Sequence, residues 1–306
     1  MTAPDHSASV WQAGLSARPG LTGVRRRSYP KLVWTWLYRS VVVLLIGLGG
    51  LTMLVPFLWM VTTSLKTDQQ VFTIPPVWIP NPVMWSNYPA AWGVANFPRY
   101  FLNSIVVSVT VTAISLLLNS MAGYAFAKYN FRGRDVIFTL TISSMMIPFQ
   151  VTMIPVFILL RNLGWLNAFS GLIVPSLASA FGIFLMRQFF YTIPSDLLDS
   201  GRIDGAGEFR VFAQIVLPLC RPAFAALGIF TFMGSWNNFI WPLIVVRSDD
   251  MRTLPLAVAA LAAGNYIMSW PLLMGGAVFV VVPVILVFLV LQRYFIQGIA
   301  LTGIKG

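Results

Sequence analysis

Charged residues are scarce in this chain: Asp, Glu, Lys and Arg together make up 9% of its 306 residues. An ordinary soluble domain contains about 25% charged residues. Hydrophobic residues make up 58% of the chain, and the mean hydropathy is +0.79. A chain of this composition cannot cover itself with a polar surface, so the sequence predicts a membrane protein.

Reactive side chains are also few. The one histidine is His6, in the polar N-terminal segment, and the one cysteine, Cys220, cannot form an internal disulfide. A hydrolytic or redox enzyme needs a nucleophile with its base, a carboxylate pair or a metal cluster. We therefore expect that the chain is not an enzyme.

Two further absences bear on energy coupling. The phosphate-binding pattern G-x-x-x-x-G-K-[ST] does not occur, so any nucleotide chemistry belongs to another chain. Secondary transporters and pumps place ionisable groups within the membrane. The helices predicted below are uncharged until their ends, where Arg187 and Arg293 lie, so ion coupling is not expected.

Seven long windows contain no charged residue, and a spanning helix needs about 20 apolar residues. The window from 69 to 98 holds six prolines, which break helical hydrogen bonds, so we interpret it as an external loop with interfacial tryptophans. The other windows predict an all-α membrane protein. Its six transmembrane helices are expected at about residues 38–63, 102–126, 136–160, 168–190, 223–246 and 271–293.

Basic residues divide unevenly between the two sides of such a bundle. Fifteen lie on the side of the termini and five on the other side. Because cytoplasmic loops are enriched in Lys and Arg, both termini are expected in the cytoplasm. This topology explains the net charge of +11, and no basic and aromatic residues interleave as a nucleic-acid groove requires.

The expected organisation has three parts. Residues 1–36 form a cytoplasmic tail, residues 37–295 the six-helix membrane domain, and residues 296–306 a cytoplasmic C-terminal tail. The run Arg25-Arg26-Arg27 would suit a twin-arginine leader. However, the apolar stretch after it is too long and lacks a small-residue cleavage site, so a disordered tail is expected.

One polar segment, residues 191–222, interrupts the apolar second half of the chain. Pro194 fits the first turn of a helix, and Ser195 and Asp196 place oxygen atoms near its free N–H groups. A short helix is therefore expected to begin here. Gly205 and Gly207 are expected to end it.

The same segment has apolar faces. Leu197, Leu198 and Gly201 lie at helical spacing, so they are expected to share one face. Pro218 and Pro222 predict a bend into the fifth span. A second amphipathic helix is predicted from Phe209, Phe212, Val216 and Leu219. On pattern alone, two interpretations explain residues 191–222 equally well: a solvated loop, and an element that transmits force from a soluble partner.

This segment contains a set of residues that is similar to a known loop. The set is Ile203-Asp-Gly-Ala206, Phe209, Ile215 and Leu217-Pro-Leu-x-x-Pro222. It resembles the EAA loop of the inner-membrane permease subunits of bacterial ATP-binding cassette (ABC) importers. The chain departs from that pattern at Asp199-Ser200-Gly201, where Asp199 keeps the acidic character of the usual Glu.

Other motifs in the right order are similar to carbohydrate-importer permeases that resemble the smaller maltose permease subunit. The similarity runs from about Thr62 to the C-terminus. The motifs are Asn119 to Tyr129, Phe131-Arg-Gly-Arg134, Met146-Ile-Pro148 with Pro155, Leu163-Gly-Trp165 with Asn167, Ser235 to Phe239, and Gln292 to Gly306.

This resemblance implies a type I importer fold and the partners of such an importer. They are a second homologous permease, two cytoplasmic ATPases that bind ATP and Mg²⁺, and an external sugar-binding protein; the chain itself needs no cofactor. The implied function is uptake of a disaccharide or oligosaccharide, whose identity the sequence does not give. A permease for glycerol phosphate and a scaffold or channel without ATP coupling stay open, as does a homodimer in place of a heterodimer.

The resemblance also assigns site residues. The C-terminal Gly303, Lys305 and Gly306 would reach the ATPase interface, and the loop Arg247–Trp270 would contact the binding protein. A frayed terminus and an ordinary surface loop are the alternatives. The residues expected to couple the permease to the ATPase are Asp196, Asp199, Ser200, Gly201, Asp204, Gly205, Ala206 and Phe209.

A passage for a hydroxyl-rich solute needs polar or aromatic groups inside the bundle, since the solute must exchange water for new hydrogen bonds. Amides in membranes also join helices to each other, and we favour that role for any single residue. Five prolines, at 148, 155, 175, 242 and 283, could kink helices that must rock, or could be tolerated bends. The candidates for the passage are Asn119, Gln150, Trp236, Asn237 and Asn238.

Overall fold

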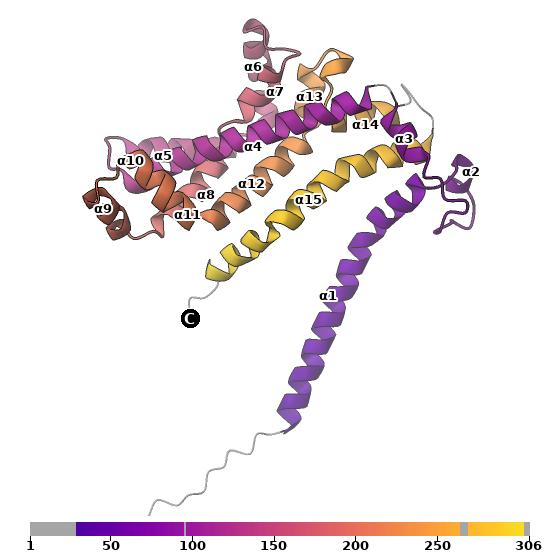
Figure 1. The fold of residues 1–306 in the computed structure, drawn as a ribbon, viewed down its shortest axis with the longest axis horizontal. Coiled ribbons are helices and arrows are strands. Elements are labelled where there is room, and N and C mark those ends of the chain that lie inside the picture. The colour runs from indigo at the N-terminus through magenta and orange to yellow at the C-terminus, as the bar shows by residue number, and fades with distance from the viewer. Residues whose placement is uncertain (1–28, 95, 264–268, 303–306) are drawn as a thin grey trace, which may run out of the picture. The chain divides into compact units, whose positions relative to one another are not determined.

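The computed structural model describes residues 29–94, 96–263 and 269–302. Within these ranges all regular elements are helices (Figure 1). The chain divides into two compact units, Met1–Val55 and Pro56–Gly306, which we describe separately.

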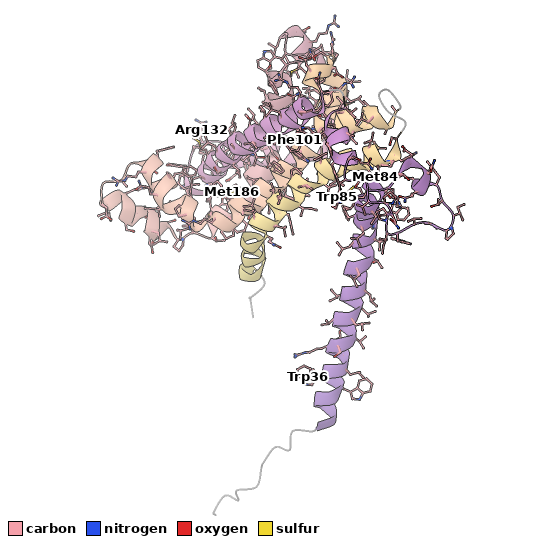
Figure 2. The ribbon with its side chains drawn as sticks, turned by 45° about the vertical axis from the view of Figure 1, so that its right-hand side comes forward. Trp36, Met84, Trp85, Phe101, Arg132 and Met186 are labelled. Carbon is pink, nitrogen blue, oxygen red and sulfur yellow. The ribbon has the colours of Figure 1, made fainter. Side chains whose placement is uncertain are left out.

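Most of helix α1 (Tyr29–Ser64) belongs to the first unit. Side chains project from all around this helix, and Trp36 is exposed like its neighbours (Figure 2). A helix that is apolar all round suits a lipid environment. The stretch Trp34–Ser64 is long and apolar enough to cross a membrane, as predicted.

The second unit is built around helix α4 (Phe97–Lys128). It packs along α8 (Ala180–Tyr191) and α12 (Arg221–Trp236), and α12 packs on α15 (Trp270–Thr302), so these helices lie side by side (Figure 1). The approach of α4 to α8 depends on glycine. A Cβ atom at Gly123 would lie 2.9 Å from a backbone nitrogen of α8, so no larger residue fits there.

The predicted helix 136–160 is wrong as a single span. The chain instead forms α5 (Arg134–Ser143) with a short 3-10 turn and then α6 (Phe149–Asn162), and the two parts meet at 103°. Pro148 causes the break, because it has no N–H and forces the preceding Ile147 out of the helical conformation.

The predicted fourth and fifth spans are also broken. Helix α7 (Phe169–Ile173) and the 3-10 turn η2 (Val174–Ser176) precede α8 with a bend of 42°. Helix α12 ends at Trp236, and three residues separate it from α13 (Ile240–Val245). The described residues contain three unbroken helices that could cross a membrane, or up to six spans if each bent pair counts as one. The all-α membrane fold is confirmed.

Short elements make up the connections. The proline-rich window forms only α2 (Asp68–Val71) and α3 (Asn87–Trp92), so a long helix is absent from its described residues, as predicted. Asn87 Nδ2 donates to the carbonyls of Ser64 and Lys66, at 2.9 Å each, and fastens α3 to the end of α1. Two further elements, η4 (Asp249–Met251) and α14 (Leu254–Ala262), precede α15.

The polar segment between α8 and α12 is helical nearly throughout. It contains α9 (Ser195–Ile203), α10 (Glu208–Arg210), a π-helical stretch η3 (Val211–Val216) and α11 (Leu217–Leu219). An 83° bend then leads into α12, as the two prolines predicted. At the other end of the chain, α15 continues to Thr302, beyond the expected end of the last span.

Candidate coupling site

Helix α9 begins where the sequence predicted and ends in a defined turn. Pro194 is extended, and the helix runs from Ser195. At its end, the N–H of Gly205 donates to the carbonyl of Arg202 and the N–H of Ala206 to that of Gly201, both at 3.0 Å. These two bonds form a Schellman motif, which needs a left-handed residue, and Gly205 supplies it with φ +81°.

One face of α9 packs against η3. Leu198 is 1% exposed and joins a core that holds Val211 and Val216. A Cβ atom at Gly201 would lie only 2.5 Å from Ile215 Cδ1, so this glycine allows the close approach. Leu197 is exposed, and the predicted common face is wrong for this residue, because one helical step turns it away from Leu198.

A charged network links α9 to α10 and to the end of α4. Arg202 pairs with Asp199 at 2.8 Å, and its Nε and Nη2 atoms donate to the Glu208 carboxylate at 2.7 and 3.1 Å. The Tyr129 hydroxyl donates to the same carboxylate at 2.5 Å. Hydrogen bonds from Arg202 and then Tyr129 hold the pKa of Glu208 below its usual value, so it is ionised at neutral pH.

Two cations fasten the start of the polar segment to the same end of the bundle. Lys128 Nζ, in the last turn of α4, donates to the Ile193 carbonyl at 2.5 Å. The Arg187 guanidinium lies 3.6 Å from the centre of the Phe138 ring and donates to the Tyr191 hydroxyl at 2.7 Å. A movement of α9 would therefore be transmitted to α4 and α8.

Three large apolar residues of this segment are exposed, and we call them the α9 surface: Leu197 and Ile203 of α9 and Phe209 of α10. Ile203 is 86% exposed and Phe209 70% exposed. Large apolar side chains in a polar segment are typical of a contact with another protein. Acidic residues Asp196, Asp199 and Asp204 accompany them, and a group that could hold a metal is absent from the described residues. The geometry suits docking and force transmission.

Comparison with known proteins identifies the family. Residues 119–301 match the family described as binding-protein-dependent transport system inner membrane component. The chain belongs to this family. It is an inner-membrane permease with several spans, and membership in a transport family confirms that it is not an enzyme.

Individual permeases are similar over most of their length. The arabinooligosaccharides transport system permease protein AraQ of Bacillus subtilis (strain 168) is 38% identical over 274 residues, which cover 88% of this chain and 96% of AraQ. The sn-glycerol-3-phosphate transport system permease protein UgpE of Yersinia enterocolitica is 33% identical over 259 residues, 82% of this chain and 92% of UgpE.

A solved structure shares the fold. A chain in the crystal structure of a bacterial ABC transporter involved in the import of the acidic polysaccharide alginate matches with a TM-score of 0.74 and 25% identity, over 85% of this permease and 96% of that chain. Together these matches confirm the ABC importer permease fold and the resemblance found in the sequence.

The eight candidate coupling residues of the permease lie in α9, in the turn after it and, for Phe209, in α10. The tail residues Gly303, Lys305 and Gly306 lie outside the described residues. The loop expected to meet the binding protein is fastened to the start of α4: Asn103 Nδ2 donates to the Asp250 carbonyl at 2.8 Å. The coupling segment and this loop therefore lie at opposite ends of α4 (Figure 1).

Two of the candidate passage residues are fully engaged in packing. Asn119 is buried; its Oδ1 accepts from the Ser179 N–H at 3.0 Å, and its Nδ2 donates to Ser115 Oγ at 2.6 Å. It thereby satisfies the backbone where the fourth span is broken. Trp236 is buried against Phe232, and its Nε1 donates to the Val280 carbonyl at 2.9 Å. Both placements fit the joining of helices.

The other three candidates are more accessible. Asn237 and Asn238 lie between α12 and α13 and line a cavity, whereas Gln150 is exposed in the first turn of α6 and lies outside that lining.

Sequence reasoning missed the link from Glu208 to Tyr129. Arg202 and Glu208 carry opposite charges six positions apart and could have been paired, but Tyr129 lies 79 positions away and gave no signal.

Proposed function

We propose that this permease is a transmembrane subunit of an ATP-driven importer for sugars and that its α9 surface docks on a cytoplasmic ATPase. The observation that carries the proposal is the combination of an exposed apolar surface with a firm attachment: Ile203 is exposed, while the adjacent Arg202 is tied through Glu208 to α4. A partner that grips this surface would move the helices of the bundle.

The positions of the coupling segment and of the loop fastened at Asn103 support the transmission of force across the membrane. Helix α4 has 32 residues, and at a rise of about 1.5 Å per residue it is long enough to cross a bilayer. The ATPase would act at its Lys128 end, and an external binding protein would act on the loop fastened at Asn103. The excess of basic residues on the side of Lys128 supports a cytoplasmic location for that end.

The proposed assembly contains four kinds of subunit. Six spans supply only part of the wall of a passage, so a second, homologous permease completes it, and we favour a heterodimer. ATP and Mg²⁺ bind to the ATPase dimer, and we propose that Gly303, Lys305 and Gly306 contribute to the interface with it. An external sugar-binding protein delivers the solute.

The sugar class is supported by relatives. AraQ is named for arabinooligosaccharides, and the transporter with the shared fold imports a polysaccharide. A second candidate solute is a glycerol phosphate, which the likeness to UgpE favours. The two solutes differ in charge, and the lining of the cavity described below supports the neutral sugar.

A pair of matched variants tests the docking. The permease is co-expressed with its partner subunits, and retention of the ATPase during purification is measured for Ile203→Asp and for Ile79→Asp. Ile79 is 82% exposed, close to the 86% of Ile203, but it lies in the proline-rich loop expected outside. We expect Ile203→Asp to lose the ATPase and uptake, with Ile79→Asp like wild type. Equal retention by both variants would refute docking at α9.

A further inference from the structure

A cavity of about 630 Å³ lies where three broken helices meet. This volume is within the range of about 300–1,000 Å³ that is usual for small-molecule sites. The start of α6, the end of η2 and the gap between α12 and α13 all contribute to its wall. Residues that line it include Phe149, Ser176, Asn237, Asn238, Phe239 and Trp241.

Polar groups in this wall are available to a ligand. Asn238 uses its Oδ1 to accept from the Trp241 N–H at 3.3 Å, and its amide N–H₂ group has no hydrogen bond among the described residues. Asn237 and Ser176 have no side-chain hydrogen bond to any residue that the structure describes. Each is able to exchange a bond to water for a bond to a hydroxyl group.

Aromatic rings form the apolar part of the wall. The rings of Phe149 and Trp241 meet edge to face, with centroids 5.9 Å apart. The Trp241 indole is fixed in place, because its Nε1 donates to the Gly171 carbonyl at 2.9 Å. Fixed rings beside free amides are the mixture that suits a sugar, which has both C–H faces and hydroxyl groups.

The cavity is also uncharged: every residue in its lining is neutral at pH 7. Helix α6 begins at this wall and α12 ends there, so the partial charges of the two helix ends are of opposite sign. An anionic solute such as a phosphate ester would need a fixed cation to replace its hydration. The lining therefore favours a neutral solute.

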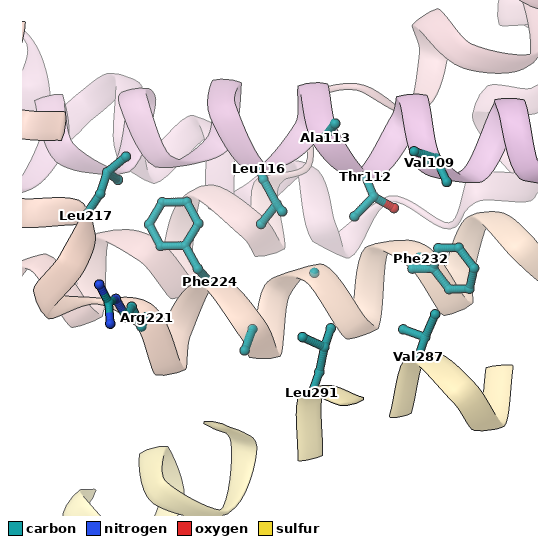
Figure 3. Close-up of a pocket in the computed structure, with 12 residues that line it drawn as sticks. Val109, Thr112, Ala113, Leu116, Leu217, Arg221, Phe224, Phe232, Val287 and Leu291 are labelled. Atoms are coloured by element: carbon teal, nitrogen blue, oxygen red, sulfur yellow. The ribbon is translucent and has the colours of Figure 1, made fainter. Parts of the chain in front are cut away.

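A second cavity of about 620 Å³ between α4, α12 and α15 lacks these features (Figure 3). Its wall is built of apolar side chains such as Leu116, Phe224 and Leu291, with Arg221 at one end and Thr112 as a hydroxyl group (Figure 3). In this cavity a hydroxyl-rich solute would lose its hydrogen bonds to water and would find few protein groups to replace them.

We infer that the cavity at the three helix breaks binds a neutral, hydroxyl-rich solute directly, so that this permease contributes its own contacts to the passage. The inference rests on the proposed importer function and narrows it, since it selects a neutral sugar over a glycerol phosphate. Asn237, Asn238 and Ser176 hydrogen-bond the solute, and Phe149 and Trp241 pack against it.

The test uses the whole importer, with its second permease, ATPase dimer and binding protein, in proteoliposomes. Radiolabelled arabinotriose and lactose serve as neutral probes and sn-glycerol 3-phosphate as the anionic probe. The number of probe molecules imported per ATP hydrolysed is measured for wild type, for Asn237→Ala/Asn238→Ala, and for Asn162→Ala, an exposed asparagine at the end of α6. This ratio separates capture of the solute from turnover of the ATPase.

We expect import of a neutral probe and a ratio about fivefold lower in the double variant, as the loss of hydrogen bonds to the solute predicts. Asn162→Ala should keep the wild-type ratio. If the double variant also loses ATPase activity, Ser176→Ala, which removes one hydroxyl group, is measured in the same way. Import with an unchanged ratio, or import of the anionic probe alone, overturns the inference and leaves the importer intact. Import of no probe, together with ATPase activity that the binding protein does not stimulate, refutes the importer function itself.

Discussion

Gly205 shows how a single backbone angle shapes the coupling site. A Cβ atom there would meet no neighbour, so the residue is constrained by its φ of +81° and not by packing. We predict that Gly205→Ala destabilises the end of α9 by about 1 kcal/mol, because a left-handed conformation is unfavourable for alanine. Amide hydrogen exchange of residues 201–206 in the purified importer should become faster.

Gly207 provides the control for this prediction. It also has open space around its Cα, but its φ is −67°, which any residue adopts. Gly207→Ala should therefore leave the exchange rates near α9 unchanged. Equal effects of the two substitutions would show that the Schellman turn does not hold the end of this helix.

At the scale of elements, the link from α4 to the coupling segment depends on a hydroxyl group. Tyr129→Phe removes the bond to Glu208 and leaves the ring in place. We expect amide exchange in α10 to become about threefold to tenfold faster, the effect of one ordinary hydrogen bond. Uptake per ATP should fall, since the link to α4 is looser.

Tyr38→Phe is the matched control for Tyr129→Phe, because Tyr38 is an exposed tyrosine of α1. It should change neither exchange in α10 nor uptake per ATP. A normal uptake ratio in Tyr129→Phe would mean that force reaches α4 by another route.

The positions of the helices could be predicted from the sequence only in part. Long uncharged windows located the three unbroken spans, in α1, α4 and α15, because a bilayer requires about 20 apolar residues in each. The breaks were harder to predict. Pro148 ends a helix, whereas Pro155 and Pro283 lie inside continuous helices, so a proline alone does not decide where a span bends. The gap after Trp236 lies several residues before the next proline, Pro242, so a proline does not mark it.

Side-chain roles depended on contacts between distant segments. The turn at Gly205 followed from local pattern and is confirmed. Asn119 was a candidate for the passage, but its partner is the broken backbone at Ser179, 60 positions away. Such a partner cannot be read from the sequence without the fold, and neither can the link between Tyr129 and Glu208.

In the whole molecule, helix α4 joins the polar segment at its Lys128 end to the loop at its Asn103 end. We propose that the polar segment receives the push of the ATPase and that the cavity at the helix breaks receives the solute. The family match fixes the permease class. In the proposed importer, the orientation expected from the basic residues places the polar segment beside an ATPase and the loop at Asn103 beside a binding protein.

Site-directed cross-linking tests this connection most directly. In a Cys220→Ser background, Ile203→Cys and Ile79→Cys are each labelled with a short reagent that carries a thiol-reactive group and a photoreactive group, and membranes that contain the whole importer are then irradiated. We predict that Ile203→Cys cross-links to the ATPase subunit and that Ile79→Cys does not. A cross-link from Ile79→Cys to the ATPase, with none from Ile203→Cys, would contradict the account.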